Sequence, residues 1–234
     1  MIFAWLTPIV IIVSIIFIVL LFTFSVRAKK KQFKQENKAT EKHAKKTENL
    51  VNNEILYMIK KELNGQGKTH PNFILFIDRY KHTNEIDNLV VTKGGIFIIE
   101  VKGWKGKVLG GKDSNQWTQI KKYHLTRYTY GYNVKIPKNP IEQNNKHLDH
   151  FFKIWKNVCS DIPKFTSIVI FPYLTNPPHG TYNIESAISY ISKLSLHGTY
   201  KVEELENVIS RIAERYGATQ LDHNKTLDYL KQKH

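Results

Sequence analysis

Three charged side chains that could do chemistry together lie within residues 84–102 of this 234-residue chain, a stretch that is mostly apolar. They are Asp87, Glu100 and Lys102. Carboxylates bind divalent cations such as Mg²⁺, and a bound cation lowers the pKa of water and offsets the negative charge that develops in phosphate chemistry. A neighbouring lysine can stabilise that charge, orient the attacking water or, if burial lowers its pKa, act as a base. This combination is typical of a metal-dependent hydrolase.

The three groups converge if residues 85–102 form a β-hairpin. Two runs rich in β-branched residues flank the pair Gly94-Gly95, and glycine adopts the positive φ of a tight turn at little cost. A two-residue loop at this pair would place Lys93 opposite Ile96, and counting outward would place Asp87 opposite Lys102.

The register of the hairpin decides whether Asp87 faces the other two groups. Side chains alternate along a strand, so Glu100 and Lys102 share one face, and the two-residue loop puts Asp87 on that face as well. A three-residue loop without a bulge would place Asp87 opposite Val101 and turn it to the other face. The glycine pair favours the first arrangement.

Two polar residues on predicted helices are further candidates for the site. Residues 49–63 carry apolar residues at helical spacing, and Glu54 lies at the edge of that apolar face, directed at the sheet. Residues 139–142 read Asn-Pro-Ile-Glu, a typical helix start, and this helix is expected to run to about Val158. Gln143 lies one turn into it, where its amide could reach the site or a DNA phosphate.

Two histidines on the same helix are weaker candidates. His147 and His150 are three residues apart, a spacing compatible with zinc, but no third ligand accompanies them. We interpret them as surface or satisfied core residues.

The order of the remaining elements indicates an α/β domain with a mixed sheet and helices on its faces. Residues 123–138 are expected to be loop and irregular strand, residues 184–192 are ambiguous, and the polar tail from Ala218 is a candidate helix. Strands are predicted at 72–78, 108–109, 116–122 and 167–171, and an amphipathic helix at 202–216.

The first 26 residues contain no charged side chain and consist mostly of Ile, Val, Leu and Phe. About 20 such residues suffice to cross a bilayer as a helix, so we predict a transmembrane anchor over residues 1–26. A cleaved signal peptide fits less well, because the apolar run is long and no small-residue cleavage site follows it. The basic flank after the anchor predicts an outside N-terminus and a cytoplasmic domain, and the single cysteine, Cys159, agrees with a reducing compartment.

Residues 27–48 form a basic juxtamembrane stalk with nine Lys or Arg and three Glu, which we expect to be helical at most in part. The simplest role of this charge is to set the membrane topology and to keep the segment solvated. A further role would be to bind anionic lipid headgroups, at roughly 1 kcal/mol per basic residue near the surface. The whole chain carries +15, so the part after the stalk still carries a large positive charge.

An excess of positive charge suits a polyanionic partner, and nucleic acid, above all DNA, is the obvious candidate. Basic residues alternate with Trp and Tyr between residues 102 and 138, a pattern that can hold phosphates and stack on unpaired bases. A solvated strand face with core aromatics would give the same pattern. The candidate nucleic-acid contacts are Lys105, Lys107, Lys121, Lys122 and Arg127.

Taken together, these motifs resemble those of the nuclease-related domain (NERD) family, part of the PD-(D/E)XK nuclease superfamily. The resemblance is close over about residues 49–158 and looser over 159–200. Asn53 and Asn88 are minor departures from the family's usual residues. The similar strings are residues 85–88 (Glu-Ile-Asp-Asn), residues 95–106, Trp117 and residues 139–144 (Asn-Pro-Ile-Glu-Gln-Asn).

The resemblance implies a restriction-endonuclease-like core with a metal-dependent active site. Asp87 and Glu100 would hold Mg²⁺ or Mn²⁺, and Lys102 would be the catalytic lysine. Glu54 would be the acid of the first helix and Gln143 the glutamine of the fourth motif. These five residues are the expected catalytic set.

The expected protein is therefore a membrane-anchored nuclease that hydrolyses DNA, or less readily RNA. Its nuclease domain would span residues 49–200, and residues 201–234 would form a helical extension. One alternative is a non-catalytic nucleic-acid- or protein-binding module on the same fold. Another is a scaffold whose charge serves lipid binding.

Overall fold

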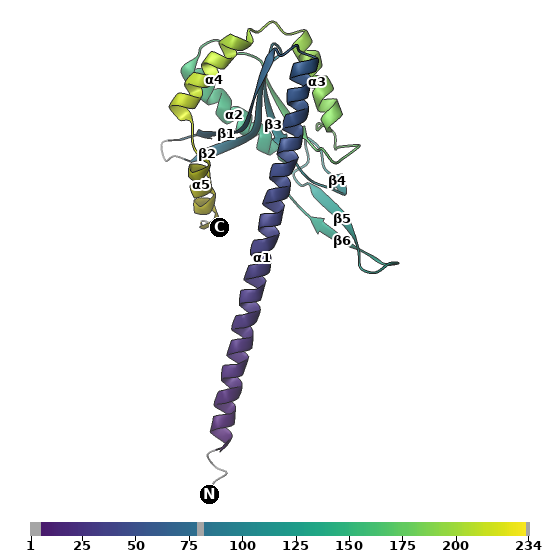
Figure 1. Cartoon of the computed structure of the whole chain (residues 1–234), viewed down its shortest axis with the longest axis vertical. Coiled ribbons are helices and arrows are strands. Elements are labelled where there is room, and N and C mark those ends of the chain that lie inside the picture. The colour runs from purple at the N-terminus through teal and green to yellow at the C-terminus, as the bar shows by residue number, and fades with distance from the viewer. Residues whose placement is uncertain (1–5, 79–81, 233–234) are drawn as a thin grey trace. The chain divides into compact units, whose positions relative to one another are not determined.

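The structure is a computed structural model that describes residues 6–78 and 82–232 (Figure 1). Their side chains are described continuously over residues 38–78 and 82–230. The chain divides into two compact units, Met1–Lys45 and Lys46–His234, and every element after the first helix belongs to the second unit.

The first helix, α1, runs from Leu6 to Lys61. It contains the helix predicted at 49–63 except for its last two residues, and it also contains residues 27–48, so the expectation that the stalk is helical at most in part was wrong. Lys, Glu, Gln and Ala dominate the stalk, and these residues have high helix propensity. Among the described residues, no helix carries an apolar stretch long enough to cross a membrane. The anchor predicted over residues 1–26 falls largely on positions whose side chains lie outside that description.

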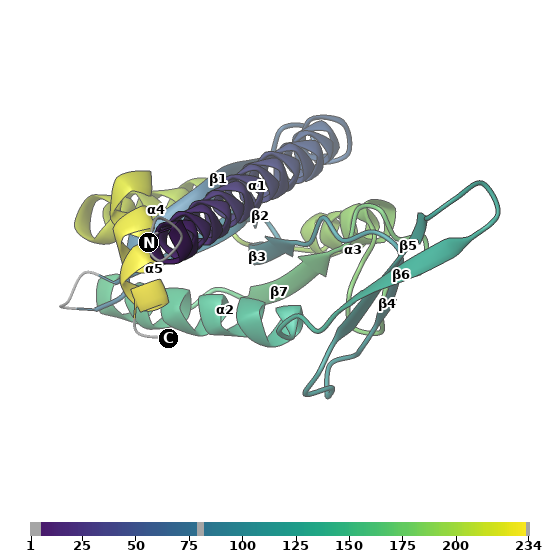
Figure 2. The same cartoon turned by 90° about the horizontal axis from the view of Figure 1, so that it is seen from below.

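The second unit is built on a mixed four-stranded sheet in the order β1-β2-β3-β7 (Figure 2). Its first three strands are antiparallel neighbours, and β7 runs parallel to β3. The prediction of an α/β fold with a mixed sheet flanked by helices is confirmed. The strands are β1 (Gly67–Phe76), β2 (Thr83–Thr92), β3 (Gly95–Val101) and β7 (Phe165–Ile170).

Helices cover both faces of this sheet, which explains why β3 is buried along its whole length. On one face, Leu89, Ile96 and Ile98 form a core with α2 (Pro140–Val158) and α4 (Val202–Tyr216).

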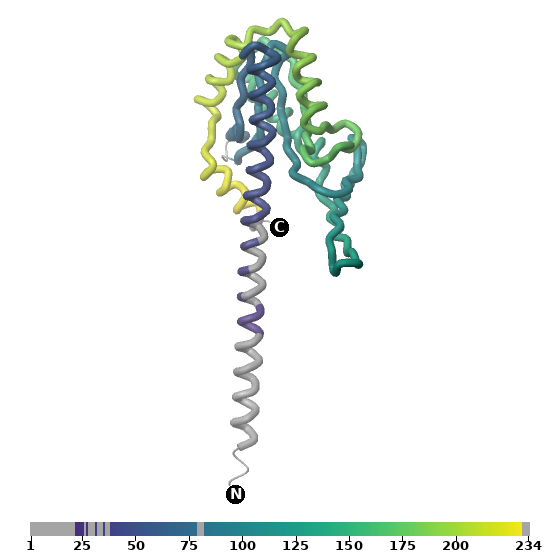
Figure 3. The backbone as a smooth tube through the Cα atoms, turned by 45° about the vertical axis from the view of Figure 1, so that its right-hand side comes forward, coloured from purple at the N-terminus to yellow at the C-terminus, as the bar shows by residue number. Residues whose placement is uncertain are grey.

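On the other face, Val90, Phe97 and Ile99 pack against the last turns of α1 and against α3 (Ile184–Leu196) (Figure 3). Because strand side chains alternate, Glu100 and Lys102 lie on the α2 face with Ile96 and Ile98.

Three short strands form a separate antiparallel sheet in the order β4-β5-β6. Residues 123–138, expected to be loop and irregular strand, contain the whole of β6, which pairs with β5 to form a hairpin. The sheet rests on a small core of Trp117, Ile141, Val169 and Phe171. Figure 2 shows the β5–β6 hairpin extending away from the four-stranded sheet. The strands are β4 (Lys107–Leu109), β5 (Thr118–His124) and β6 (Tyr130–Lys135).

Three helical predictions can be compared directly with the structure. The helix predicted from residue 139 is α2, and the Asn139 side chain caps it by accepting the backbone N–H groups of Ile141 and Glu142. The ambiguous segment at 184–192 is α3, which begins with a capping box between Asn183 and Ser186. The polar tail forms α5 (Gln220–Gln232).

The β2–β3 turn is displaced by one residue from its predicted position. Thr92 pairs with Gly95, so the loop is Lys93-Gly94 rather than Gly94-Gly95. Gly95 instead opens β3 with φ +113°, and a Cβ there would lie 2.3 Å from the Lys164 carbonyl oxygen. The turn still has two residues, so the pairing shifts by two positions and the faces of the strands are unchanged.

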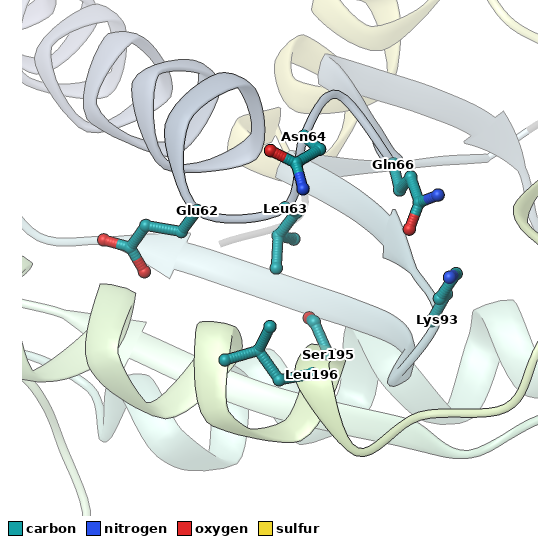
Figure 4. Close-up of a pocket in the computed structure, with 7 residues that line it drawn as sticks. All are labelled: Glu62, Leu63, Asn64, Gln66, Lys93, Ser195 and Leu196. Atoms are coloured by element: carbon teal, nitrogen blue, oxygen red, sulfur yellow. The ribbon is translucent and has the colours of Figure 1, made fainter.

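The end of α3 meets this turn and the end of α1 around a small cavity of about 90 Å³ (Figure 4). Ser195 on α3 is hydrogen-bonded to Thr92 through the two hydroxyls at 2.7 Å. The Thr92 hydroxyl also accepts the N–H of Gly94 at 3.0 Å. These contacts fix the turn, and the turn sets the hairpin register.

Gly95→Ala is expected to lower the free energy of unfolding by about 3 kcal/mol, because it combines a φ that only glycine tolerates with a clash against backbone. Urea denaturation followed by tryptophan fluorescence measures this. Gly65→Ala is the matched control, since Gly65 also has positive φ but nothing lies within 4 Å of the position that its methyl group would take. Equal losses in the two variants would show that the close approach to Lys164 is unimportant.

Candidate active site

Asp87 and Glu100 lie side by side where strands β2 and β3 separate. The ladder between these strands ends at the pair Asn88–Ile99, and the next position on each strand is an acid. The N–H of Val101 does not continue the ladder but donates to Asp87 Oδ2 at 2.8 Å. Asp87 therefore faces Glu100 directly, whereas the predicted loop would have placed it opposite Lys102.

The Glu100 carboxylate is the best-buried polar group of the site, with 3 % of its side chain exposed. Its Oε1 accepts a short hydrogen bond from the Lys102 ammonium and a second one from Gln143 Nε2 at 2.9 Å. Lys102 also donates to Gln143 Oε1 at 3.1 Å. The structure thus brings Asp87, Glu100, Lys102 and Gln143 together.

Gln143 reaches the sheet because α2 is held firmly at its first turns. The Asn139 cap fixes where the helix begins, and the side-chain amide of Asn144 donates to the carbonyl oxygens of Ile98 and Ile168 on β3 and β7. The Gln143 side chain thereby points from α2 toward Lys102 and Glu100 at the end of β3.

His147 also belongs to the site, although the sequence analysis treated it as a surface or core residue. Its Nε2 lies 3.5 Å from Glu100 Oε2 and 3.4 Å from Gln143 Nε2, and its Nδ1 makes a short hydrogen bond with Asn84 Oδ1. The signal was available, because His147 follows Gln143 by four residues and so lies on the same helix face. Burial is the main cause that lowers the pKa of His147.

The acid that α1 contributes to the electrostatics of Asp87 is Glu48, not Glu54. Glu48 raises the pKa of Asp87 through its negative charge. Glu54 instead lines a groove of about 740 Å³ between α1 and α3, together with Tyr57 and Ile184. Glu48 was assigned to the stalk, yet it lies three residues before the buried Val51, and that spacing could have found it.

A family model described as "Nuclease-related domain" (NERD) matches residues 45–172, more than half of the chain. The chain belongs to the NERD family. An uncharacterized protein of Bacillus anthracis is 25 % identical over 112 residues, which is 48 % of this chain and 49 % of the relative. The chain thus matches about half the length of that curated relative. No solved structure matches it.

The acidic pair of this NERD domain is electrostatically strained. Burial, and then the charge of Glu100, raise the pKa of Asp87 well above its usual value. The Val101 N–H and the charge of Lys102 lower the same pKa, but they do not offset the increase. A proton or a cation between the two carboxylates would relieve this repulsion.

The donor set fits a hard divalent cation. Among the described residues, no group of three or more His, Cys, Asp or Glu is assembled around a metal position. Mg²⁺, however, commonly binds through one or two carboxylates and fills its other positions with water and substrate phosphate. Asp87 and Glu100 provide those carboxylates, and Asp87 Oδ1 accepts no hydrogen bond from the described part of the chain.

The raised pKa of Asp87 predicts a pH-dependent loss of stability in metal-free protein. The folded state keeps the Asp87 proton to higher pH than the unfolded state, whose pKa is about 3.9. The contribution of this proton to the free energy of unfolding is therefore complete below about pH 4, and it is lost as the pH rises through the raised pKa of Asp87. The difference in unfolding free energy between wild type and Asp87→Asn, measured from pH 4 to 8 in chelator, isolates this contribution. A pH-independent difference would contradict it.

The five basic residues predicted to contact nucleic acid lie on or beside the small sheet. All of them are exposed, although the ammonium of Lys105 lies 4.7 Å from the ring centre of Tyr173. Gln119 of β5 donates to the Lys105 carbonyl oxygen at 2.9 Å, which ties the small sheet to the segment that follows Lys102. The others are Lys107 on β4, Lys121 and Lys122 on β5, and Arg127 in the β5–β6 loop.

Proposed function

We propose that this NERD domain is a divalent-metal-dependent nuclease that hydrolyses phosphodiester bonds in DNA, or less readily in RNA, on a restriction-endonuclease-like core. The observation that carries the proposal is the convergence of Asp87, Glu100 and Lys102 at the adjoining ends of β2 and β3, where Gln143 of α2 bonds both Glu100 and Lys102. A purely structural ion pair does not need a second acid whose pKa burial raises.

In this proposal Asp87 and Glu100 hold Mg²⁺ or Mn²⁺, which would lower the pKa of a bound water and offset charge on the phosphate. Lys102 supplies a positive charge beside the acids. Gln143 bonds both Lys102 and Glu100, so it fixes their mutual position before substrate arrives. His147 restrains the second oxygen of Glu100 from the same helix.

The test is cleavage of end-labelled DNA by the full-length protein, purified in detergent, with Mg²⁺, with Mn²⁺ and with chelator. Glu100→Gln should lower the rate by about 100-fold or more, since it removes a ligand of the cation. Glu54→Gln is the matched control on α1 and should retain activity, whereas Glu48→Gln should lower it. Full cleavage by Glu100→Gln would refute the site.

Retained DNA binding without cleavage under any divalent cation would instead assign a non-catalytic binding module.

We also propose that residues 1–26 anchor the protein in a membrane with the domain on the cytoplasmic side. The uncharged sequence of this segment and the basic flank from Arg27 to Lys34 support this. The basic residues directly after the anchor would then lie near anionic lipid headgroups. The protein should stay with membranes after carbonate extraction, and release into the supernatant would contradict the anchor.

A further inference from the structure

The β5–β6 hairpin concentrates positive charge and exposed aromatic rings. No acidic residue occurs between Asp113 and Glu142, whereas five basic residues do. Four tyrosines of this hairpin are 45 to 81 % exposed. Exposed rings at this density cannot be explained by core packing.

The two faces of the hairpin differ. Lys122 pairs with Tyr132 and His124 pairs with Tyr130, so these four side chains share one face, which we call the outer face. On the opposite face, Tyr123 lies flat across Gly131, where a Cβ would come within 2.4 Å of its ring. Tyr123 thus packs on its cross-strand neighbour, whereas Tyr132 on the outer face is 63 % exposed.

The outer face is ordered before any partner binds. The Lys122 ammonium lies 3.5 Å from the ring centre of Tyr130, and the His124 and Tyr130 rings are 4.7 Å apart. The ammonium held over Tyr130 places charge for a phosphate beside Tyr132, whose exposed ring offers the surface for a base. The rings therefore form a platform that loses little conformational entropy on binding.

We propose that the outer face of the β5–β6 hairpin, formed by Lys122, His124, Tyr130 and Tyr132, binds an unpaired stretch of a nucleic-acid strand. Bases in a duplex are already stacked on one another, whereas unpaired bases can stack on exposed tyrosines. The proposal deepens the proposed function, on which it rests for nucleic acid as the partner, and it makes a single-stranded segment the preferred substrate.

The hairpin is joined to the active site. Trp104, two residues after Lys102, packs edge-on against Trp117 and Phe171, which support the small sheet. Trp117 directly precedes β5. A nucleic-acid strand bound to the outer face would therefore lie on a hairpin that is packed against the residues following Lys102.

The test is fluorescence anisotropy of labelled oligothymidylate and of a labelled duplex, with the full-length protein in detergent and chelator, so that cleavage does not occur. Tyr132→Ala should weaken oligothymidylate binding by roughly 5- to 100-fold and duplex binding much less. Tyr132→Phe should bind like wild type, because stacking needs the ring and not the hydroxyl. Tyr57→Ala, which removes an equally exposed tyrosine from α1, should have no effect.

An equal loss for single strand and duplex, or no loss in Tyr132→Ala, would overturn the inference. So would a hairpin that gains hydrogen-exchange protection on anionic nanodiscs but none with oligothymidylate, which would assign the face to a membrane surface. These outcomes are separate from the nuclease test, because binding is measured without metal. Ring-dependent binding without cleavage would refute the nuclease and leave this inference standing.

Discussion

Lys102→Met is expected to lower the free energy of unfolding by about 3 kcal/mol and to abolish cleavage. Only 18 % of the Lys102 side chain and 3 % of the Glu100 side chain are exposed, so the substitution leaves a buried carboxylate without its countercharge. Gln143 still donates to Glu100, but a neutral amide does not replace an ammonium. Urea denaturation in chelator measures the loss.

Two comparisons separate the lost ion pair from a general effect of the substitution. Adding Glu100→Gln to Lys102→Met should restore most of the stability, since the unpaired charge is then gone, while activity stays absent. Lys146→Met breaks the exposed pair with Glu142 and should leave the unfolding midpoint unchanged. A Lys102→Met protein as stable as Lys146→Met would show that the Glu100 charge is well solvated.

Asp87→Asn is expected to act in opposite directions on stability and activity. Cleavage should fall by about 100-fold or more, because a ligand of the proposed cation is lost. Metal-free stability should rise by about 1 kcal/mol, because a neutral amide removes the repulsion with Glu100 and still accepts the Val101 N–H. Cleavage rate and chemical denaturation on the same preparation measure both.

The control for Asp87→Asn is the response to metal. Mg²⁺ should raise the unfolding midpoint of wild type, because a ligand that binds only the folded state stabilises it. It should not raise the midpoint of Asp87→Asn. Equal stabilisation of both proteins would mean that the cation binds elsewhere.

The central residues of the site could be predicted from the sequence because side chains alternate between the two faces of a strand, which limits where each can lie. Glu100 and Lys102 share a face wherever the turn lies, and misplacing the turn by one residue changed the residue opposite Asp87 from Lys102 to Glu100 but kept the three groups together. The Asn139 cap likewise placed Gln143, since a cap fixes where a helix begins.

The residues that the sequence analysis missed depend on packing between distant elements. Helical spacing places Glu48 and His147 on helix faces that meet the sheet, but only the packing of α1 and α2 on the sheet brings Glu48 close to Asp87 and His147 close to Glu100. The regular strand β6 was predicted only as part of a region of loop and irregular strand. Its residues face solvent on both sides along much of its length, so they lack the apolar alternation typical of a strand.

The most direct measurement of the central claim is a crystal structure of the protein with Mn²⁺, located by its anomalous scattering. We predict one ion within about 2.2 Å of carboxylate oxygens from both Asp87 and Glu100, with the Lys102 ammonium beside the site. Anomalous density elsewhere, with Asp87 and Glu100 free of metal in a protein that still cleaves DNA, would contradict the account.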